Sequence, residues 1–190
     1  VIVGVGPWAK QAWAMLGLPD KIDVKDADGN VHVDQQMWIY WQLVEGAIAM
    51  DPKLYVTAEG KTPPVFHFDS REPLISQKTG KQLNDGLWGV YWKQDRTGVQ
   101  GGAEPECLGP EAEVDPYGPE SPKYVVGADF SEYWTSGLAH AMERFEGCYT
   151  LYEDAPTGGI GCFTSDSFPI FDTAPGIPNV YVIADSNHGF

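Results

Sequence analysis

The chain has 190 residues, of which 43% are hydrophobic and 13% aromatic. This is enough for one domain, or one domain and part of another, with a real core. Twenty-seven acidic residues against twelve basic ones give a formal net charge of -15, which argues against nucleic acid and anionic membrane surfaces as partners. No stretch of the sequence is apolar for long enough to predict a membrane span.

The three cysteines are Cys107, Cys148 and Cys162, widely spaced and odd in number. This pattern favours free thiols in a reducing compartment over a disulfide framework, so we expect a cytoplasmic protein. The sequence has no CxxC, CxxH or HExxH pattern, and we therefore predict no metal site.

The N-terminal segment predicts a strand, a turn and a helix. Residues 1–5 are mostly β-branched and apolar, Pro7 suits the first position of a helix, and Gly17 ends the helical spacing. Gly4, Gly6 and Ala9 fit G-x-G-x-x-A, the fingerprint of a dinucleotide-binding turn. Two interpretations are open: the first turn of a nicotinamide-binding domain, or a turn packed near a cofactor that is bound mainly elsewhere.

The middle of the chain predicts mostly strands. Residues 26–30 form a tight turn between short strands. Aromatic and β-branched runs predict further strands over 37–44, 65–68 and 86–94, the last turning into another short strand. Residues 101–122 are rich in Gly, Pro and acidic side chains and predict a long surface loop.

The second helix is predicted from Asp129, as its cap, with Glu132 completing a capping box and Gly147 ending the segment. Its apolar stripe comprises Phe130, Tyr133, Trp134, Leu138, Met142 and Phe145. Two final strands are expected, around Thr164 and Val180. The fold class is therefore α+β, with helices flanking a mixed or antiparallel sheet.

The last residues, 179–190, are a β-rich apolar run followed abruptly by small and polar residues. Such a run predicts a buried strand that delivers a loop to a ligand. Because such a loop should lead into a helix, and because the chain opens on Val1, we expect a piece of a larger enzyme. Three roles are open to His188: catalytic base, hydrogen-bond donor to a cofactor, or interior histidine.

Four segments, in this order, resemble the FAD-dependent amine and amino-acid oxidoreductases of the D-amino-acid oxidase, glycine oxidase and sarcosine oxidase group. They are the strand and Gly-Pro-Trp turn of 1–18, Ile39–Gly46, Phe163–Asp172 with its Pro-Ile, and 180–190 with its His-Gly-Phe. The resemblance implies an FAD-domain part at 1–36, a substrate domain at 37–150, and a return to the FAD domain at 151–190. It also implies hydride transfer from the carbon beside an amine to flavin N5.

The resemblance assigns roles to residues. The cofactor-binding residues it implies are Gly4, Gly6, Pro7, Trp8, Thr164, Asp166, Asp185, Ser186, Asn187, His188 and Gly189. His188 is the catalytic candidate. The residues expected to bind a small amine or amino-acid substrate are Tyr40, Trp41, Tyr91, Trp92 and Phe163.

The chain also departs from that family. Its ADP-binding Gly-x-Gly-x-x-Gly half is absent, so we expect the remaining N-terminal half of the FAD domain as a partner and an inactive isolated chain that binds FAD poorly. Trp41 stands where the family often has Arg, and Val99–Ala103 lacks the His and Lys of some members. Cys162 lies near the place of a flavin-linking Cys, but we expect non-covalent FAD. The alternative is a non-catalytic domain that binds small molecules in an aromatic pocket.

Overall fold

The computed structural model describes residues 1–51, 53, 56–94, 98–103, 106–111, 114, 128–166 and 168–185. Its contacts divide the chain into two units. The first comprises Val1–Gln42, Glu106–Gly118 and Ile160–Phe190, and the second comprises Leu43–Pro105 and Pro119–Gly159. Strands predominate over helices in the described residues, which is compatible with the expected α+β fold. The roles that we expect for the two parts stay predictions.

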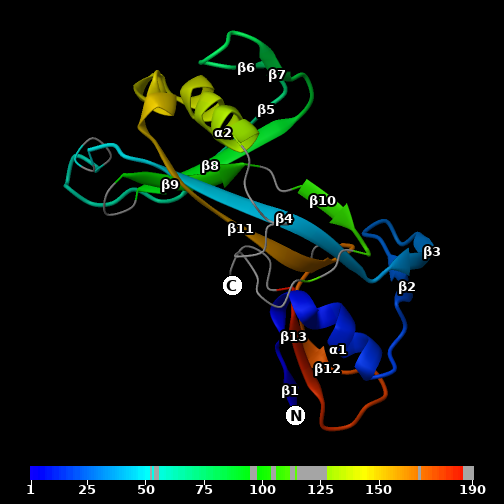
Figure 1. The fold of residues 1–190 in the computed structure, drawn as a ribbon. Helices are drawn as coiled ribbons and strands as arrows, with labels where there is room; N and C mark the ends of the chain where they lie inside the picture. Colours follow the sequence, from blue (N-terminus) through cyan, green and yellow to red (C-terminus); the bar gives the residue numbers. More distant parts are fainter. Residues whose placement is uncertain are drawn as a thin grey trace. The chain divides into compact units, whose positions relative to one another are not determined.

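The first unit contains a three-stranded sheet with strand order β1-β13-β12 (Figure 1). The strands are β1 (Ile2–Val3), β12 (Ile170–Thr173) and β13 (Tyr181–Ala184). β1 runs parallel to β13, and β12 runs antiparallel to it. A 3-10 turn at Gly6–Trp8 leads into α1 (Ala9–Met15), so the predicted strand, turn and helix are confirmed.

A β-hairpin follows α1 in the same unit. It pairs β2 (Lys21–Lys25) with β3 (Val31–Gln36) around the predicted turn. The carboxylate of Asp26 organises this turn by accepting hydrogen bonds from the backbone N–H groups of Asp28 and Asn30. The side-chain hydrogen bond with His32 is the largest of the contacts that lower the pKa of Asp26 to about 2.

The long strand β4 (Trp38–Ile48) begins in the first unit and continues in the second. Its first half pairs antiparallel with β10 (Glu106–Gly109). Its second half pairs with β9 (Val99–Ala103), and the sheet continues through β8 (Trp88–Gln94) to β5 (Phe66–Ser70). β11 (Tyr152–Thr164) also pairs with β4. A separate small ribbon joins β6 (Leu74–Ile75) to β7 (Gln82–Asn84).

The predicted capping box of the second helix is wrong. α2 (Ala128–Ala141) places Asp129 within its first turn. The carboxylate of Glu132 instead accepts hydrogen bonds from the hydroxyls of Ser76 and Thr79, which lie between β6 and β7. The Glu132 carboxylate, which was expected to cap its own helix, is therefore occupied by two hydroxyl groups from a distant part of the sequence.

The end of α2 and the loop that was predicted after β8 also differ from expectation. The helix ends at Ala141 and gives way to 3-10 turns at Glu143–Phe145 and Cys148–Leu151, so Gly147 does not end it. The expected loop at 101–122 contains the end of β9 and all of β10. Its remaining part from residue 115 lies outside the described residues.

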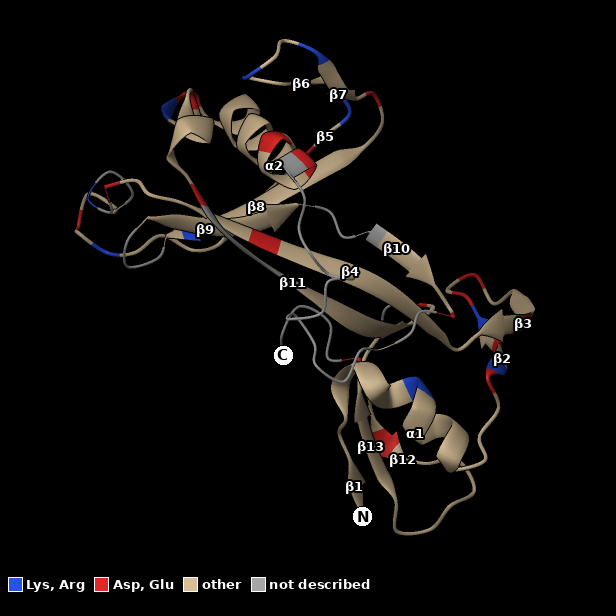
Figure 2. Cartoon of the chain, viewed as in Figure 1, with Lys and Arg blue, Asp and Glu red and all other residues tan. Residues whose placement is uncertain are grey.

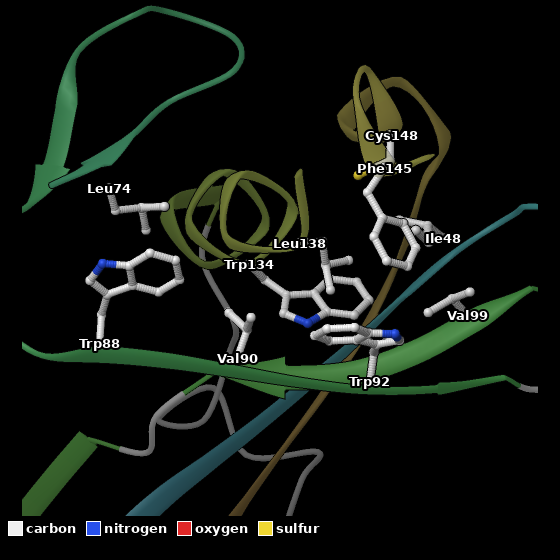
Figure 3. Packing of buried hydrophobic residues seen from close by; sticks show 10 residues of the cluster. All are labelled: Ile48, Leu74, Trp88, Val90, Trp92, Val99, Trp134, Leu138, Phe145 and Cys148. Carbon is white, nitrogen blue, oxygen red and sulfur yellow. The ribbon is translucent and has the colours of Figure 1, made fainter. Parts of the chain in front are cut away.

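The core of the second unit forms between β8 and α2. Trp88, Val90 and Trp92 alternate along β8 and all point toward the helix (Figure 3). Trp134 and Leu138 meet them from α2, and both are 0% exposed. This contact is close because α2 carries Gly137 there: a Cβ at that position would lie 2.6 Å from Cγ1 of Val90.

In the part of the chain that the structure describes, neither α-helix combines the length and the apolar character that a membrane crossing requires. The same residues hold no group of His, Cys, Asp and Glu side chains arranged to bind a metal ion.

Leu138→Ala should lower the free energy of unfolding by about 2–5 kcal/mol, because it opens a cavity in this core. Leu87→Ala is the matched control, since Leu87 is 57% exposed and its truncation should cost less than about 0.5 kcal/mol. Urea unfolding followed by tryptophan fluorescence measures both. Equal losses for the two variants would contradict the packing described.

Candidate functional site

Three segments that the sequence singles out meet at one edge of the β1-β13-β12 sheet. β1 and β13 are parallel, so their carboxyl ends lie at the same edge. β12 is antiparallel, and its first residue Ile170 pairs with Ala184 at the end of β13. The turn after β1, the loop before β12 and the loop after β13 therefore share this edge. In open α/β sheets the carboxyl ends of parallel strands are where ligands bind.

The turn after β1 brings glycine backbone close to β13. A Cβ built on Gly4 would be in van der Waals contact with Ile183, 3.8 Å from its Cβ and its carbonyl oxygen. Gly6 has a φ of +55°, a conformation that favours glycine. Trp8, at the end of the same turn, is 39% exposed and so presents an aromatic surface beside this backbone.

Asp185 and Thr164 tie the other two loops together. Asp185 is 8% exposed, and its Oδ2 lies 2.6 Å from the backbone nitrogen of Thr164 and 2.5 Å from the Thr164 hydroxyl. That hydroxyl also lies 2.8 Å from Oδ1 of Asp166 and 2.9 Å from the carbonyl oxygen of Phe168. A hydroxyl has one proton, so it donates to one of these three acceptors at a time.

Asp185 itself adopts a left-handed backbone conformation, with a φ of +51°. This conformation is uncommon for a residue other than glycine, and Asp and Asn adopt it more readily than most. The chain therefore turns sharply where β13 ends. The expected site residues Ser186, Asn187, His188 and Gly189 follow at once and lie outside the described residues, so their roles stay predictions.

A shallow pocket opens between α1 and the sheet of the first unit. Its lining is apolar and consists of Val3, Val5, Ala9, Ala12, Trp13, Leu16, Val182, Ile183 and Ala184. The one polar atom among these side chains, Nε1 of Trp13, already donates to the carbonyl oxygen of Pro19 at 2.9 Å. The pocket therefore offers packing space beside the turn but no polar group that could orient a substrate.

In the first unit, the structure separates the two expected substrate residues on β4. Tyr40 is 1% exposed and belongs to the hydrophobic core, where burial is the largest cause that raises its pKa. Trp41 is the next residue of the strand, so its side chain leaves the opposite face and is half-buried. Phe163 is also half-buried, with its ring against Gly161. Of this pair on β4, only Trp41 keeps an appreciable surface open to a ligand.

In the second unit, β8 divides its expected substrate residues in the same way. Trp92 is 4% exposed and packs in the core, stacked on Phe66 at 5.4 Å and edge-on to Phe145 at 5.6 Å. Tyr91 points to the other face of the sheet, away from α2. Trp92 thus serves as a core residue, and Tyr91 is the one of the two that faces outward.

Tyr91 belongs to a polar group that the sequence interpretation missed. Its hydroxyl donates to Oε1 of Glu45 at 2.9 Å, and Nε2 of Gln100 donates to Oε2 of the same carboxylate at 2.9 Å. The His67 ring stacks on the Tyr91 ring at 5.5 Å. Burial, followed by the hydrogen bond to Glu45, raises the pKa of Tyr91, so this hydroxyl keeps its proton near neutral pH. The sequence signal that could have revealed this group is Glu45, the one charged residue in the strand over 38–48.

Cys162 lies in the core of the first unit and is 6% exposed. Burial raises its pKa to about 11, and the same cause raises the pKa of Cys148 to about 11. These are the properties of structural thiols rather than of reactive ones.

Comparison with known proteins gives a relationship of fold. No protein-family model matches the chain, and no curated protein matches it. A crystal structure of glycine oxidase from Geobacillus kaustophilus is similar, with a TM-score of 0.53 and 16% sequence identity. The match covers 97% of this chain and 35% of that one, so the chain spans about a third of the length of the oxidase. At this level of identity the two proteins share a fold, distantly.

Thr164→Val should destabilise the chain by about 1–3 kcal/mol, because it leaves the buried Asp185 carboxylate without its hydroxyl donor. Thr173→Val is the matched control: the Thr173 side chain is exposed, and its loss should cost less than about 0.5 kcal/mol. Chemical denaturation monitored by circular dichroism compares them. If the two variants unfold alike, the bond between Thr164 and Asp185 does not stabilise this edge of the sheet.

Cys107 should react with iodoacetamide well before Cys148 and Cys162 do. Cys107 is exposed. Each of the two buried thiols has a pKa of about 11, so at pH 8 only about one molecule in a thousand has that thiol ionised. Peptide mass spectrometry after timed labelling measures the order, and raising the pH should speed labelling of the buried pair. Rapid labelling of Cys162 in the folded protein would show that it is accessible and reactive.

Proposed function

We propose that this chain is part of an FAD-dependent oxidoreductase that oxidises the C–N bond of a small amine or amino acid. The observation that carries the proposal is the meeting of three segments at the carboxyl edge of the β1 and β13 pair. The similarity of the fold to a glycine oxidase supports it. No one of the three segments by itself identifies an FAD-binding protein. Their meeting at one edge of the sheet is a property of the folded chain, and similar sequence motifs alone would not ensure it.

The first unit offers groups that suit FAD. A Cβ at Gly6 would meet no described atom within 4 Å, so the backbone there could admit the close approach that a dinucleotide requires, while Gly4 packs against β13. Thr164 and Asp185 would hold the loops at this edge in place, and Trp8 would give an aromatic surface. Ser186 to Gly189 would then follow β13 toward the cofactor, with His188 as the catalytic candidate. When bound, the flavin supplies the hydride-accepting chemistry.

The second unit would contribute to the binding of substrate through the face of its sheet opposite α2. Tyr91 is the expected substrate residue that faces this side, and its hydroxyl is held by Glu45. Trp41 and Phe163 stay candidates in the first unit.

Further FAD contacts would come from a partner half of the cofactor domain. The chain spans 35% of the glycine oxidase to which it is similar, and the sequence lacks the Gly-x-Gly-x-x-Gly of an ADP-binding half. We therefore propose that the remaining N-terminal half of an FAD domain completes the site. We therefore expect the isolated chain to bind FAD weakly and to catalyse no reaction. We also propose that the FAD is not covalently attached, because Cys162, the candidate linking residue, is buried.

The whole protein that contains this chain should purify with flavin absorption bands, and anaerobic addition of the right small amine or amino acid should bleach them. A panel of N-methyl amino acids, D-amino acids and simple amines, followed by visible spectroscopy, measures this. Release of the flavin by acid precipitation would verify that it is not covalently bound.

A colourless protein that ignores added FAD would overturn the proposal and favour the non-catalytic binding domain. The absence of His and Lys from Val99–Ala103 is the feature of the sequence that supports this alternative. Flavin bands that no amine bleaches would support the FAD cofactor but contradict the proposed substrate class.

A further inference from the structure

Glu45 lies on the face of the second-unit sheet opposite α2. Its neighbours Gly46 and Ile48 face the helix: a Cβ at Gly46 would lie 3.0 Å from the Phe130 ring, and Ile48 is in the core. Side chains alternate along a strand, so Glu45 points the other way. β4 carries no other acidic residue and no Lys or Arg (Figure 2).

Glu45, Tyr91 and Gln100 come from three adjacent strands, β4, β8 and β9. Glu45 pairs in register with Gly102, which in turn pairs with Tyr91. A Cβ at Gly102 would lie 2.7 Å from the hydroxyl oxygen of Tyr91. The tyrosine ring can therefore lie over Gly102 and reach across β9 to the carboxylate. The arrangement holds the carboxylate in one place on the face opposite α2.

The charge of this carboxylate is not neutralised within the described part of the chain. No described Lys, Arg or His nitrogen lies within the 4.0 Å of an ion pair with Glu45. Its two described hydrogen-bond donors, Tyr91 and Gln100, are uncharged. Two oxygens offer about four acceptor positions, of which these donors use two.

The other described charged groups on this face form no ion pair with Glu45. His67 stacks on Tyr91 on the side of β5, and Lys93 follows Tyr91 by two residues on β8, so both share its face. Asp69 lies on β5 two residues beyond His67. A half-buried carboxylate gains most from a partner of opposite charge. The chain as a whole, at a net charge of -15, also attracts cations rather than anions.

We propose that Glu45 binds the ammonium group of a cationic amine that carries no carboxylate. This inference rests on the proposed function and specifies its substrate class. An ammonium group donates up to three hydrogen bonds and suits the acceptor positions that Glu45 keeps. An α-amino acid would bring its own carboxylate to the same place, where the charge of Glu45 repels it.

Titration of the chain with putrescine, a small diamine, tests the proposal without FAD. Isothermal calorimetry should give binding that Glu45→Gln weakens about tenfold, because a charge-assisted hydrogen bond is lost. Glu146→Gln, which removes the same charge from an exposed position of the same unit, should bind as the unchanged chain does. 4-Aminobutyrate, which adds a carboxylate, should bind more weakly than putrescine.

A second measurement uses the unchanged protein, in case Glu45→Gln does not fold. In 15N NMR spectra, putrescine should shift the side-chain amide signal of Gln100, which bonds the same carboxylate. No shift, or equal binding by the Glu45→Gln and Glu146→Gln variants, would overturn the proposal and leave the Glu45 group as a structural tie between strands. Failure of flavin reduction, in contrast, bears on the proposed function alone, because putrescine binding requires no flavin.

Discussion

The parallel pairing of β1 with β13 is the contact on which the candidate cofactor edge depends. It joins residues from the two ends of the sequence: Ile2 pairs with Tyr181, and Val3 with Val182. The backbone nitrogen of Val1 adds a hydrogen bond of 2.6 Å to the carbonyl oxygen of Asn179. Without this pairing the glycine turn and the loop that contains Asp185 would have no common edge.

The two units illustrate different relations between packing and chemistry. In the second unit, β8 uses one face for the core, where Trp88 and Trp92 meet α2, and the other face for Tyr91. Because side chains alternate between the two faces of β8, this one strand contributes both to the hydrophobic core and to the polar group around Glu45. In the first unit the polar groups sit instead in loops at the end of a small sheet, where Thr164 and Asp185 fix each other.

The face of the second-unit sheet opposite α2 carries a polar group that the sequence did not predict. The tyrosine that the sequence marks as a substrate residue is a neutral donor, and the group it serves is the carboxylate of Glu45. A carboxylate at this place favours a cationic ligand, whereas an arginine would favour an amino acid.

The sequence by itself determined the elements whose signals are local. Turn residues and apolar periodicity sufficed for the strand, turn and helix at the N-terminus, the hairpin around Asp26 and the strand that contains Trp88. Only the tertiary structure decided which partner each side chain meets. Glu132 accepts hydrogen bonds from hydroxyls in the turn between β6 and β7 rather than capping its own helix end, and Trp92 enters a core while Tyr91 reaches Glu45. These outcomes depend on strand register and on contacts between distant segments, which local propensity does not encode.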